Sequence, residues 1–166
     1  MNVRIVVGDV LDQAADVLIS TANPQLNLSG GVNGAILLRG GESIQEELHS
    51  YLRRLGRSHA EPGSVIVTRP GPLAFCHILH AVAVDALYGS SVELVAGTIG
   101  RALTMAHELS ARSVAMSALA TGYGPLTISE FGQALRLALS RCGEPCEHLT
   151  VVVRKHEYVV ALHGYE

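Results

Sequence analysis

Short apolar runs rich in β-branched residues alternate along this chain with segments of helical period. The apolar runs predict six strands, at residues 3–7, 16–21, 64–68, 77–84, 113–118 and 149–154. Helical spacing predicts two short helices within residues 34–55, interrupted at Gly40-Gly41, and longer helices over 92–110 and 128–142. Thr127 or Ser129 is the expected N-cap of the last of these, and residues 156–166 fit either a short helix or an edge strand. Strands that alternate with helices are typical of βαβ units, so we expect an α/β fold with a mostly parallel sheet.

The composition supports a sheet buried on both faces. Hydrophobic residues make up 48% of the 166 residues and charged residues 16%. Strands of a parallel sheet covered by helices on both sides are continuous apolar runs, as observed here. The length suits one compact domain, and we therefore expect a single domain spanning residues 1–166.

Charge and cysteine content limit which binding partners and which cellular compartment we expect. A net charge of -3 and scattered basic residues argue against a nucleic-acid-binding surface. The chain has neither a signal-peptide pattern nor an apolar stretch long enough to span a membrane, so we expect a cytoplasmic protein. Cys142 and Cys146 lie near His148, which leaves a metal site as an alternative. The intervening Gly-Glu-Pro is more typical of a loop that ends a helix, and no metal or cofactor is predicted.

Two glycine-rich loops are the strongest functional signal. Gly30-Gly31-Val32-Asn33-Gly34 follows the second predicted strand, and Ala120-Thr121-Gly122-Tyr123-Gly124 follows the fifth. Glycine permits positive φ and close approach of the backbone, and the N-terminus of a following helix offers unpaired N–H groups to an anion. Ligands of open α/β sheets bind at the carboxyl ends of the strands, where both loops are expected. The loops predict a diphosphate site, although neither matches the dinucleotide fingerprint or the P-loop.

Other polar residues have two interpretations each. Asp9 follows the first predicted strand, where its carboxylate could accept from an exocyclic amine such as that of adenine; the alternative is a turn or N-cap aspartate. His77 and His80 are three residues apart in a predicted strand, so their side chains lie on opposite faces. This favours packing histidines over a metal-binding pair.

Five segments in order resemble the macro domains, which bind ADP-ribose and related metabolites. They are Gly8-Asp9-Val10, Ser20-Thr21-Ala22-Asn23, the stretch from Ser29 to Ile36, Leu79-His80-Ala81-Val82, and the stretch from Ala120 to Pro125. The resemblance covers nearly the whole chain. It implies a three-layer α/β/α fold with a central mixed, mostly parallel sheet.

The resemblance also implies a binding site. Asp9 and Val10 would hold adenine, the two glycine loops would enclose the diphosphate, and Asn23 would lie near the distal ribose. Tyr123 either covers that ribose or anchors its own loop. The implied ligand-binding residues are Asp9, Val10, Asn23, Gly30, Gly31, Val32, Asn33, Gly34, Ala35, Ala120, Thr121, Gly122, Tyr123 and Gly124.

Three positions depart from the pattern of catalytic family members. Asn33 replaces an aspartate, Ser20 an asparagine, and Leu37 a histidine. An asparagine amide cannot act as a general base, so catalysis would need help from a substrate phosphate or from a water held by Asn23 and Asn33.

These departures favour a module that binds ADP-ribose, free or attached to a macromolecule. The alternative is a hydrolase that removes ADP-ribose from a modified macromolecule or processes ADP-ribose 1''-phosphate or O-acetyl-ADP-ribose. A third interpretation is a macro-like scaffold whose pocket takes another nucleotide or no ligand.

Overall fold

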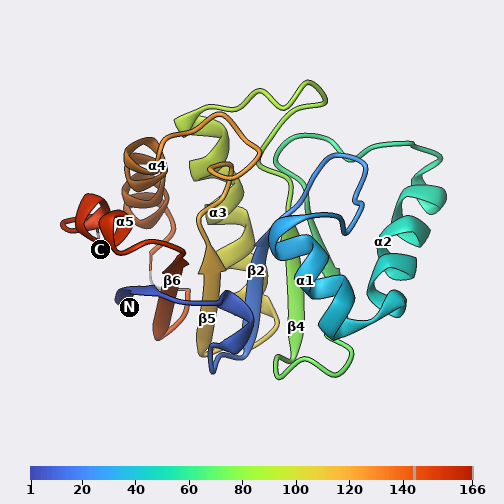
Figure 1. Cartoon of the computed structure of the whole chain (residues 1–166), viewed down its shortest axis with the longest axis horizontal. Coiled ribbons are helices and arrows are strands. Elements are labelled where there is room, and N and C mark those ends of the chain that lie inside the picture. Colours follow the sequence, from blue (N-terminus) through green and yellow to red (C-terminus); the bar gives the residue numbers. More distant parts are fainter. Residues whose placement is uncertain (144, 166) are drawn as a thin grey trace.

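A six-stranded sheet lies between two layers of helices (Figure 1). The computed structural model describes residues 1–143 and 145–165. The strands are β1 (Asn2–Val7), β2 (Val17–Thr21), β3 (Val65–Thr68), β4 (His77–Ala81), β5 (Ser113–Ser117) and β6 (His148–Val153). The helices are α1 (Gly31–Gly40), α2 (Glu42–Leu55), α3 (Val92–Glu108), α4 (Ile128–Arg141) and α5 (His156–Leu162), with a 3-10 turn, η1, at Val10–Asp12.

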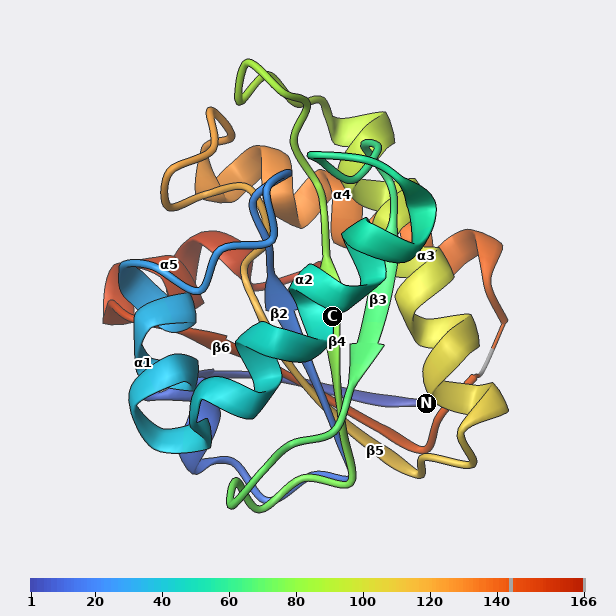
Figure 2. The same ribbon diagram turned by 90° about the vertical axis from the view of Figure 1, so that its right-hand side faces the viewer.

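The strand order is β1-β6-β5-β2-β4-β3, and only β3 runs antiparallel to its neighbour (Figure 2). Alternate residues of β2 divide the core in two. Val17 and Ile19 pack with the apolar faces of α3, α4 and α5. Leu18 packs with those of α1 and α2. The predicted three-layer arrangement with a mixed, mostly parallel sheet is confirmed.

Local signals account for the helix ends. Gly41, at φ 91°, ends α1 and begins α2, as the paired glycines predicted. Thr127 caps α4: its hydroxyl accepts from the Glu130 N–H, and the Glu130 carboxylate accepts from the Thr127 N–H. The last segment is a helix, α5, which packs on α4 where Gly132 has no side chain. A Cβ there would stand 3.0 Å from Leu162 Cδ2.

His80 is a packing residue of the sheet. It is buried, and its Nε2 lies 2.9 Å from the hydroxyl of Thr68. Burial lowers its pKa to about 3, so the imidazole is neutral. In residues 1–143 and 145–165, no three His, Cys, Asp or Glu side chains are grouped as metal ligands. The same described residues contain no helix long and apolar enough to cross a membrane.

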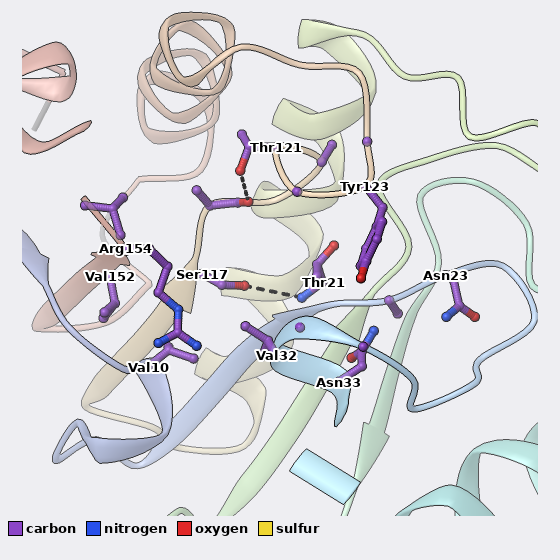
Figure 3. Close-up of a pocket in the computed structure, with 18 of the residues that line it drawn as sticks. Val10, Thr21, Asn23, Val32, Asn33, Ser117, Thr121, Tyr123, Val152 and Arg154 are labelled. Carbon is purple, nitrogen blue, oxygen red and sulfur yellow. Dashed lines mark hydrogen bonds between the residues drawn. The ribbon is translucent and has the colours of Figure 1, made fainter. Parts of the chain in front are cut away.

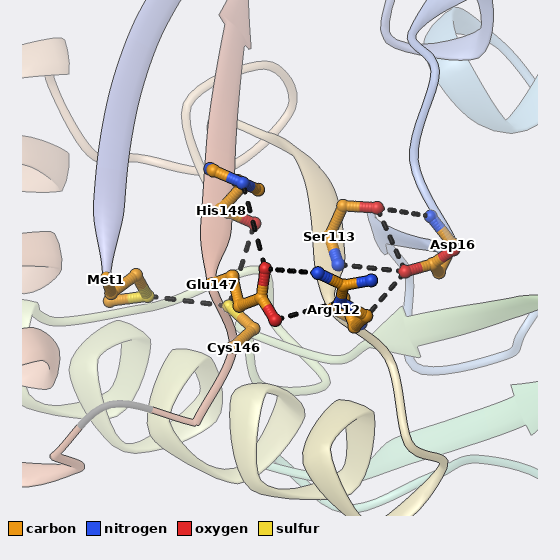
Figure 4. A network of polar contacts seen from close by, with 7 residues as sticks. All are labelled: Met1, Asp16, Arg112, Ser113, Cys146, Glu147 and His148. Atoms are coloured by element: carbon orange, nitrogen blue, oxygen red, sulfur yellow. Dashed lines mark hydrogen bonds and ion pairs between the residues drawn. The ribbon is translucent and has the colours of Figure 1, made fainter.

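A polar network joins the strands at the end of the sheet where β2 and β5 begin (Figure 4). The Asp16 carboxylate accepts from the backbone N–H groups of Arg112 and Ser113, at 2.8 and 2.9 Å, and from the Ser113 hydroxyl. Hydrogen bonds, first the one from the Ser113 N–H, hold the pKa of Asp16 below its ordinary value. The Arg112 guanidinium binds both oxygens of Glu147. This end of the sheet is therefore tied by side chains.

Candidate functional site

A cavity of about 820 Å³ opens at the opposite end, where the parallel strands finish (Figure 3). Its walls come from the segments that follow β1, β2, β4, β5 and β6. Because β6, β5, β2 and β4 are neighbours in that order, the cavity crosses the sheet from the end of β6 to the end of β4. Both glycine loops contribute to it, as expected for ligand sites of open α/β sheets.

The first glycine loop presents backbone to the cavity. Gly30 and Gly31 have φ values of 67° and 50°, which glycine adopts without the strain that a Cβ would cause. Gly30 is the N-cap of α1 and provides no capping side chain. The first N–H groups of an α-helix have no partner within the helix, so this turn leaves donors for an anion.

The second loop turns sharply after β5. Ala120 has a φ of 60°, and its carbonyl accepts from the Leu126 N–H at 3.1 Å. A Cβ on Gly124 would lie 2.4 Å from that carbonyl oxygen, so the turn requires glycine here. Gly122 has open space around it, and the backbone is exposed to the cavity. The Thr121 hydroxyl donates to the Ala118 carbonyl at 2.8 Å and stabilises the turn.

Tyr123 connects the two loops. Its side chain leaves the second loop and extends toward the first (Figure 3). The hydroxyl oxygen lies 2.7 Å from the position that a Cβ on Gly30 would occupy, so the ring covers that glycine. The residue is nevertheless 79% exposed. Tyr123 thus lines the cavity opposite the first loop with little burial of its own ring.

The two asparagines differ in what they can offer a ligand. The Asn23 amide donates to the Asn27 carbonyl at 2.7 Å and accepts from the Asn27 N–H at 2.9 Å, so it holds its own loop in shape. Asn33 is only 8% exposed, and its Oδ1 has no hydrogen-bond partner in the described part of the chain. A buried amide oxygen without a hydrogen bond lowers the stability of the folded state, so Asn33 Oδ1 is a candidate acceptor for a hydrogen bond from a ligand.

The charged side chains that line the cavity are both positive. Among the described residues they are Arg154 and Lys155, which follow β6. No Asp, Glu or His of the described residues lines the cavity. The lining therefore attracts anions, although the chain as a whole has a net charge of -3. Among the described residues, the lining therefore contains no carboxylate or imidazole, the groups that most often act as general bases near neutral pH.

The family model of the macro domain matches residues 19–138 of this chain. The chain belongs to the macro domain family. A macro domain-containing protein of Streptomyces griseus is 34% identical, with 95% of this chain and 90% of that protein covered. The match covers only 20% of an uncharacterized Thermotoga maritima protein and 65% of one from Pyrobaculum aerophilum, at 37% and 35% identity.

Solved structures have the same fold. A macrodomain of Oceanobacillus iheyensis with ADP has a TM-score of 0.84 at 24% identity, covering 97% of this chain and 87% of that one. A mutant of it with ADPR has a TM-score of 0.83 at 23% identity, covering 97% and 89%. The macrodomain of Trypanosoma brucei in complex with ADP has a TM-score of 0.81 at 20% identity, covering 99% and 68%.

Most residues singled out from the sequence line the cavity of this macro domain. They are Val10, Asn23, Gly30, Gly31, Val32, Asn33, Ala120, Thr121, Gly122, Tyr123 and Gly124. Gly34 and Ala35 lie deeper in α1, and neither they nor Asp9 line the cavity. Asp9 instead caps η1, where its Oδ1 accepts from the Leu11 N–H at 2.9 Å. Its Oδ2 lies 3.7 Å from Nη1 of Arg154.

The lining of the macro domain also includes residues that the sequence did not single out. These include Tyr88, Ser117, Val152, Arg154, Lys155 and Tyr158. None of these residues belongs to a motif that the sequence analysis recognised. For the residues at the end of β6, the available signal was positional, because the carboxyl ends of all parallel strands meet at one edge of the sheet.

Proposed function

We propose that this macro domain binds ADP-ribose, either free or attached to a macromolecule. The observation that carries the proposal is the pair of glycine loops that face one another across the middle of the cavity. Their backbone N–H groups can bind a diphosphate without basic side chains. The Oceanobacillus iheyensis structures with ADP and ADPR supply the ligand class.

We infer which way the proposed ligand lies from the residues at the two ends of the cavity, which crosses the sheet from β6 to β4. At the β6 end, Val10, Val152 and Tyr158 provide an apolar slot for the adenine base. The diphosphate would lie between the loops that follow β5 and β2. The distal ribose would then reach Asn33 and Tyr123, where the unpaired Asn33 Oδ1 can accept from a ribose hydroxyl.

The lining favours binding over hydrolysis. Hydrolysis needs a group that removes a proton from water, and the described lining has no carboxylate or imidazole. The remaining routes are assistance by a substrate phosphate and a water held jointly by Asn23 and Asn33, and the structure bears on the second. The Asn23 amide already makes two hydrogen bonds with Asn27, which weakens the route through a bound water.

We also infer a cytoplasmic location, where thiols stay reduced, because all three cysteines are free.

Calorimetric titration with ADP-ribose, ADP and AMP tests the proposed function. We expect micromolar binding of ADP-ribose and weaker binding of AMP, since AMP lacks the second phosphate and the distal ribose. The absence of both heat and thermal shift at millimolar ADP-ribose would refute binding and leave the glycine loops a structural role only. Incubation with an ADP-ribosylated protein tests the alternative, and release of ADP-ribose would establish a hydrolase.

Asp9 provides a further test beside the cavity, because its Oδ1 caps η1 while its Oδ2 makes no hydrogen bond within the described residues. We expect Asp9→Ala to weaken ADP-ribose binding by about tenfold or more, the loss of a charge-assisted hydrogen bond to the adenine amine. Asp9→Asn is the matched control for structure, because its amide oxygen can still accept from the Leu11 N–H. Unchanged affinity in both variants would show that Asp9 does not contact the base.

A further inference from the structure

Two positively charged residues that are adjacent in the sequence line one end of the cavity. Arg154 follows the last residue of β6, and Lys155 is the N-cap of α5. Both line the cavity, as do Val152 and Tyr158, and Figure 3 shows Arg154 among the lining side chains. Their side chains are 59% and 60% exposed. They are therefore accessible to a ligand that occupies this end.

The donors of both side chains are unused within the described part of the chain. Asp9 Oδ2 lies 3.7 Å from Nη1 of Arg154, which is an ion pair beyond hydrogen-bond distance. Lys155 Nζ lies 3.6 Å from Glu157 Oε1 and 5.4 Å from the centre of the Tyr158 ring. Neither cation donates a hydrogen bond to residues 1–143 or 145–165. Their charge is partly balanced, but their hydrogen bonds remain to be made.

ADP-ribose alone does not account for these two charges. This step rests on the proposed function, in which the base occupies the slot at β6 and the diphosphate lies between the glycine loops. Adenine and the ribose hydroxyls are neutral, and the diphosphate is served by backbone donors. The ribose that joins base to diphosphate lies at the same end of the cavity as Arg154 and Lys155. A further anion on that ribose would use both cations.

We propose that the preferred ligand is an ADP-ribose that bears a phosphate on its adenosine ribose, bound through Arg154 and Lys155. A guanidinium binds phosphate oxygens through two parallel N–H donors, and an ammonium adds a point charge. Dinucleotide-binding folds use an arginine in the same way to accept a 2′-phosphate. The ligand class is thus a phosphorylated ADP-ribose, with the phosphate at the 2′ or the 3′ position.

The experiment compares ligands that differ only in this phosphate. The wild-type domain is titrated calorimetrically with ADP-ribose and ADP-ribose 2′-phosphate, and then with 5′-AMP, 2′,5′-ADP and 3′,5′-ADP. We expect at least one phosphorylated ligand to bind about tenfold more tightly than its unphosphorylated partner, the gain expected from a charge-assisted contact. The position that gives the gain identifies the phosphate that the site reads.

Variants assign the gain to the two cations. Arg154→Gln and Lys155→Gln together should reduce the ratio of affinities to about one, because the phosphorylated ligand loses about tenfold more affinity than ADP-ribose does. Arg39→Gln is the matched control: its Nη1 lies 3.9 Å from Asp9 Oδ2, but Arg39 does not line the cavity. This variant removes one positive charge, where the double variant removes two, and should keep the wild-type ratio. Thermal unfolding checks that each variant is folded.

Two results would overturn the inference while leaving the proposed function intact. One is a wild-type domain that binds ADP-ribose with no gain from either phosphate. The other is a double variant that weakens ADP-ribose and its phosphorylated form equally, which would assign the cations to the base or diphosphate. If the wild type binds neither ligand, the proposed function fails and the inference fails with it.

Discussion

Burial of His80 makes a quantitative prediction about stability in acid. The side chain is fully buried in β4, where its Nε2 contacts the Thr68 hydroxyl. Its pKa falls from 6.5 in the unfolded chain to about 3 in the folded domain, because burial disfavours the charged ring. Between these two pKa values the unfolded chain binds a proton that the folded domain excludes.

The sign and size of the effect follow from this difference. The unfolded state binds more protons below pH 6.5, so stability rises with pH and is lost as the pH falls below that value. The slope is about 1.4 kcal/mol per pH unit. Allowing for partial titration near pH 6.5, His80 should destabilise the domain by about 2 kcal/mol on going from about pH 7 to about pH 5.

Urea unfolding of the wild type and of His80→Gln, at these two pH values, measures the effect. Glutamine does not titrate and retains an amide that can pair with the Thr68 hydroxyl. Carboxylates whose pKa is held low by hydrogen bonds, such as Asp16, Glu130 and Glu147, lose their contribution in acid in both proteins. Their effect cancels in the comparison. We expect the advantage of the wild type over the variant to shrink by about 2 kcal/mol at the lower pH. A constant difference would refute the neutral, buried state of His80.

Substitutions at three further positions separate the site from the scaffold. Gly122→Val should lower ADP-ribose affinity by about tenfold or more in calorimetry, because its side chain blocks the backbone donors, while open space around Gly122 leaves the melting temperature unchanged. Tyr123→Ala should weaken binding severalfold and Tyr123→Phe should not, because phenylalanine keeps the ring that extends from the second loop to the first; equal losses would assign the effect to the hydroxyl, whose oxygen lies nearest to Gly30. Asp16→Asn should cost about 1–3 kcal/mol in urea unfolding, since the acceptor of the Ser113 N–H loses its charge, with ADP-ribose affinity unchanged. A change in that affinity would contradict the separation of this network from the cavity.

Local patterns predict most of this fold because they reflect burial directly. The strand predicted at 77–84 ends at Ala81, since β2 ends opposite that residue at Thr21 and β3 begins opposite it at Val65. The segment from residue 156 onward was ambiguous because its conformation depends on packing against Gly132 of α4. The end of β4 and the conformation of the last segment both depend on contacts between distant segments. The periodicity of one segment carries no information about such contacts.

The residues of the site likewise differ in whether local sequence or the fold determines their place. The glycine loops are predictable because each loop contains its own requirement: Gly30 needs positive φ, and Gly124 must pass close to the Ala120 carbonyl. Arg154 and Tyr158 reach the cavity only because β6 lies between β1 and β5. No residue near them indicates that placement. Asp9 shows the converse: its place at a strand end predicts a ligand contact, whereas its observed hydrogen bond caps η1, so the contact with adenine stays a prediction.

Affinity and selectivity should therefore depend on different parts of this cavity. In the proposed binding mode, backbone donors in its middle contact the diphosphate, so a change at Gly122 should weaken ADP-ribose and its derivatives by a similar factor. In the same proposal, side chains at its ends contact the groups in which these ligands differ: Arg154 and Lys155 at the adenosine end, and Asn33 at the distal ribose. Replacing Arg154 and Lys155 should change the ratio of affinities between ligands. It should leave unchanged the contribution of the backbone donors, which all these ligands share. Because backbone donors do not depend on side-chain identity, sequence change at the two ends can alter which ADP-ribose derivative is bound while the phosphate site between the loops is retained.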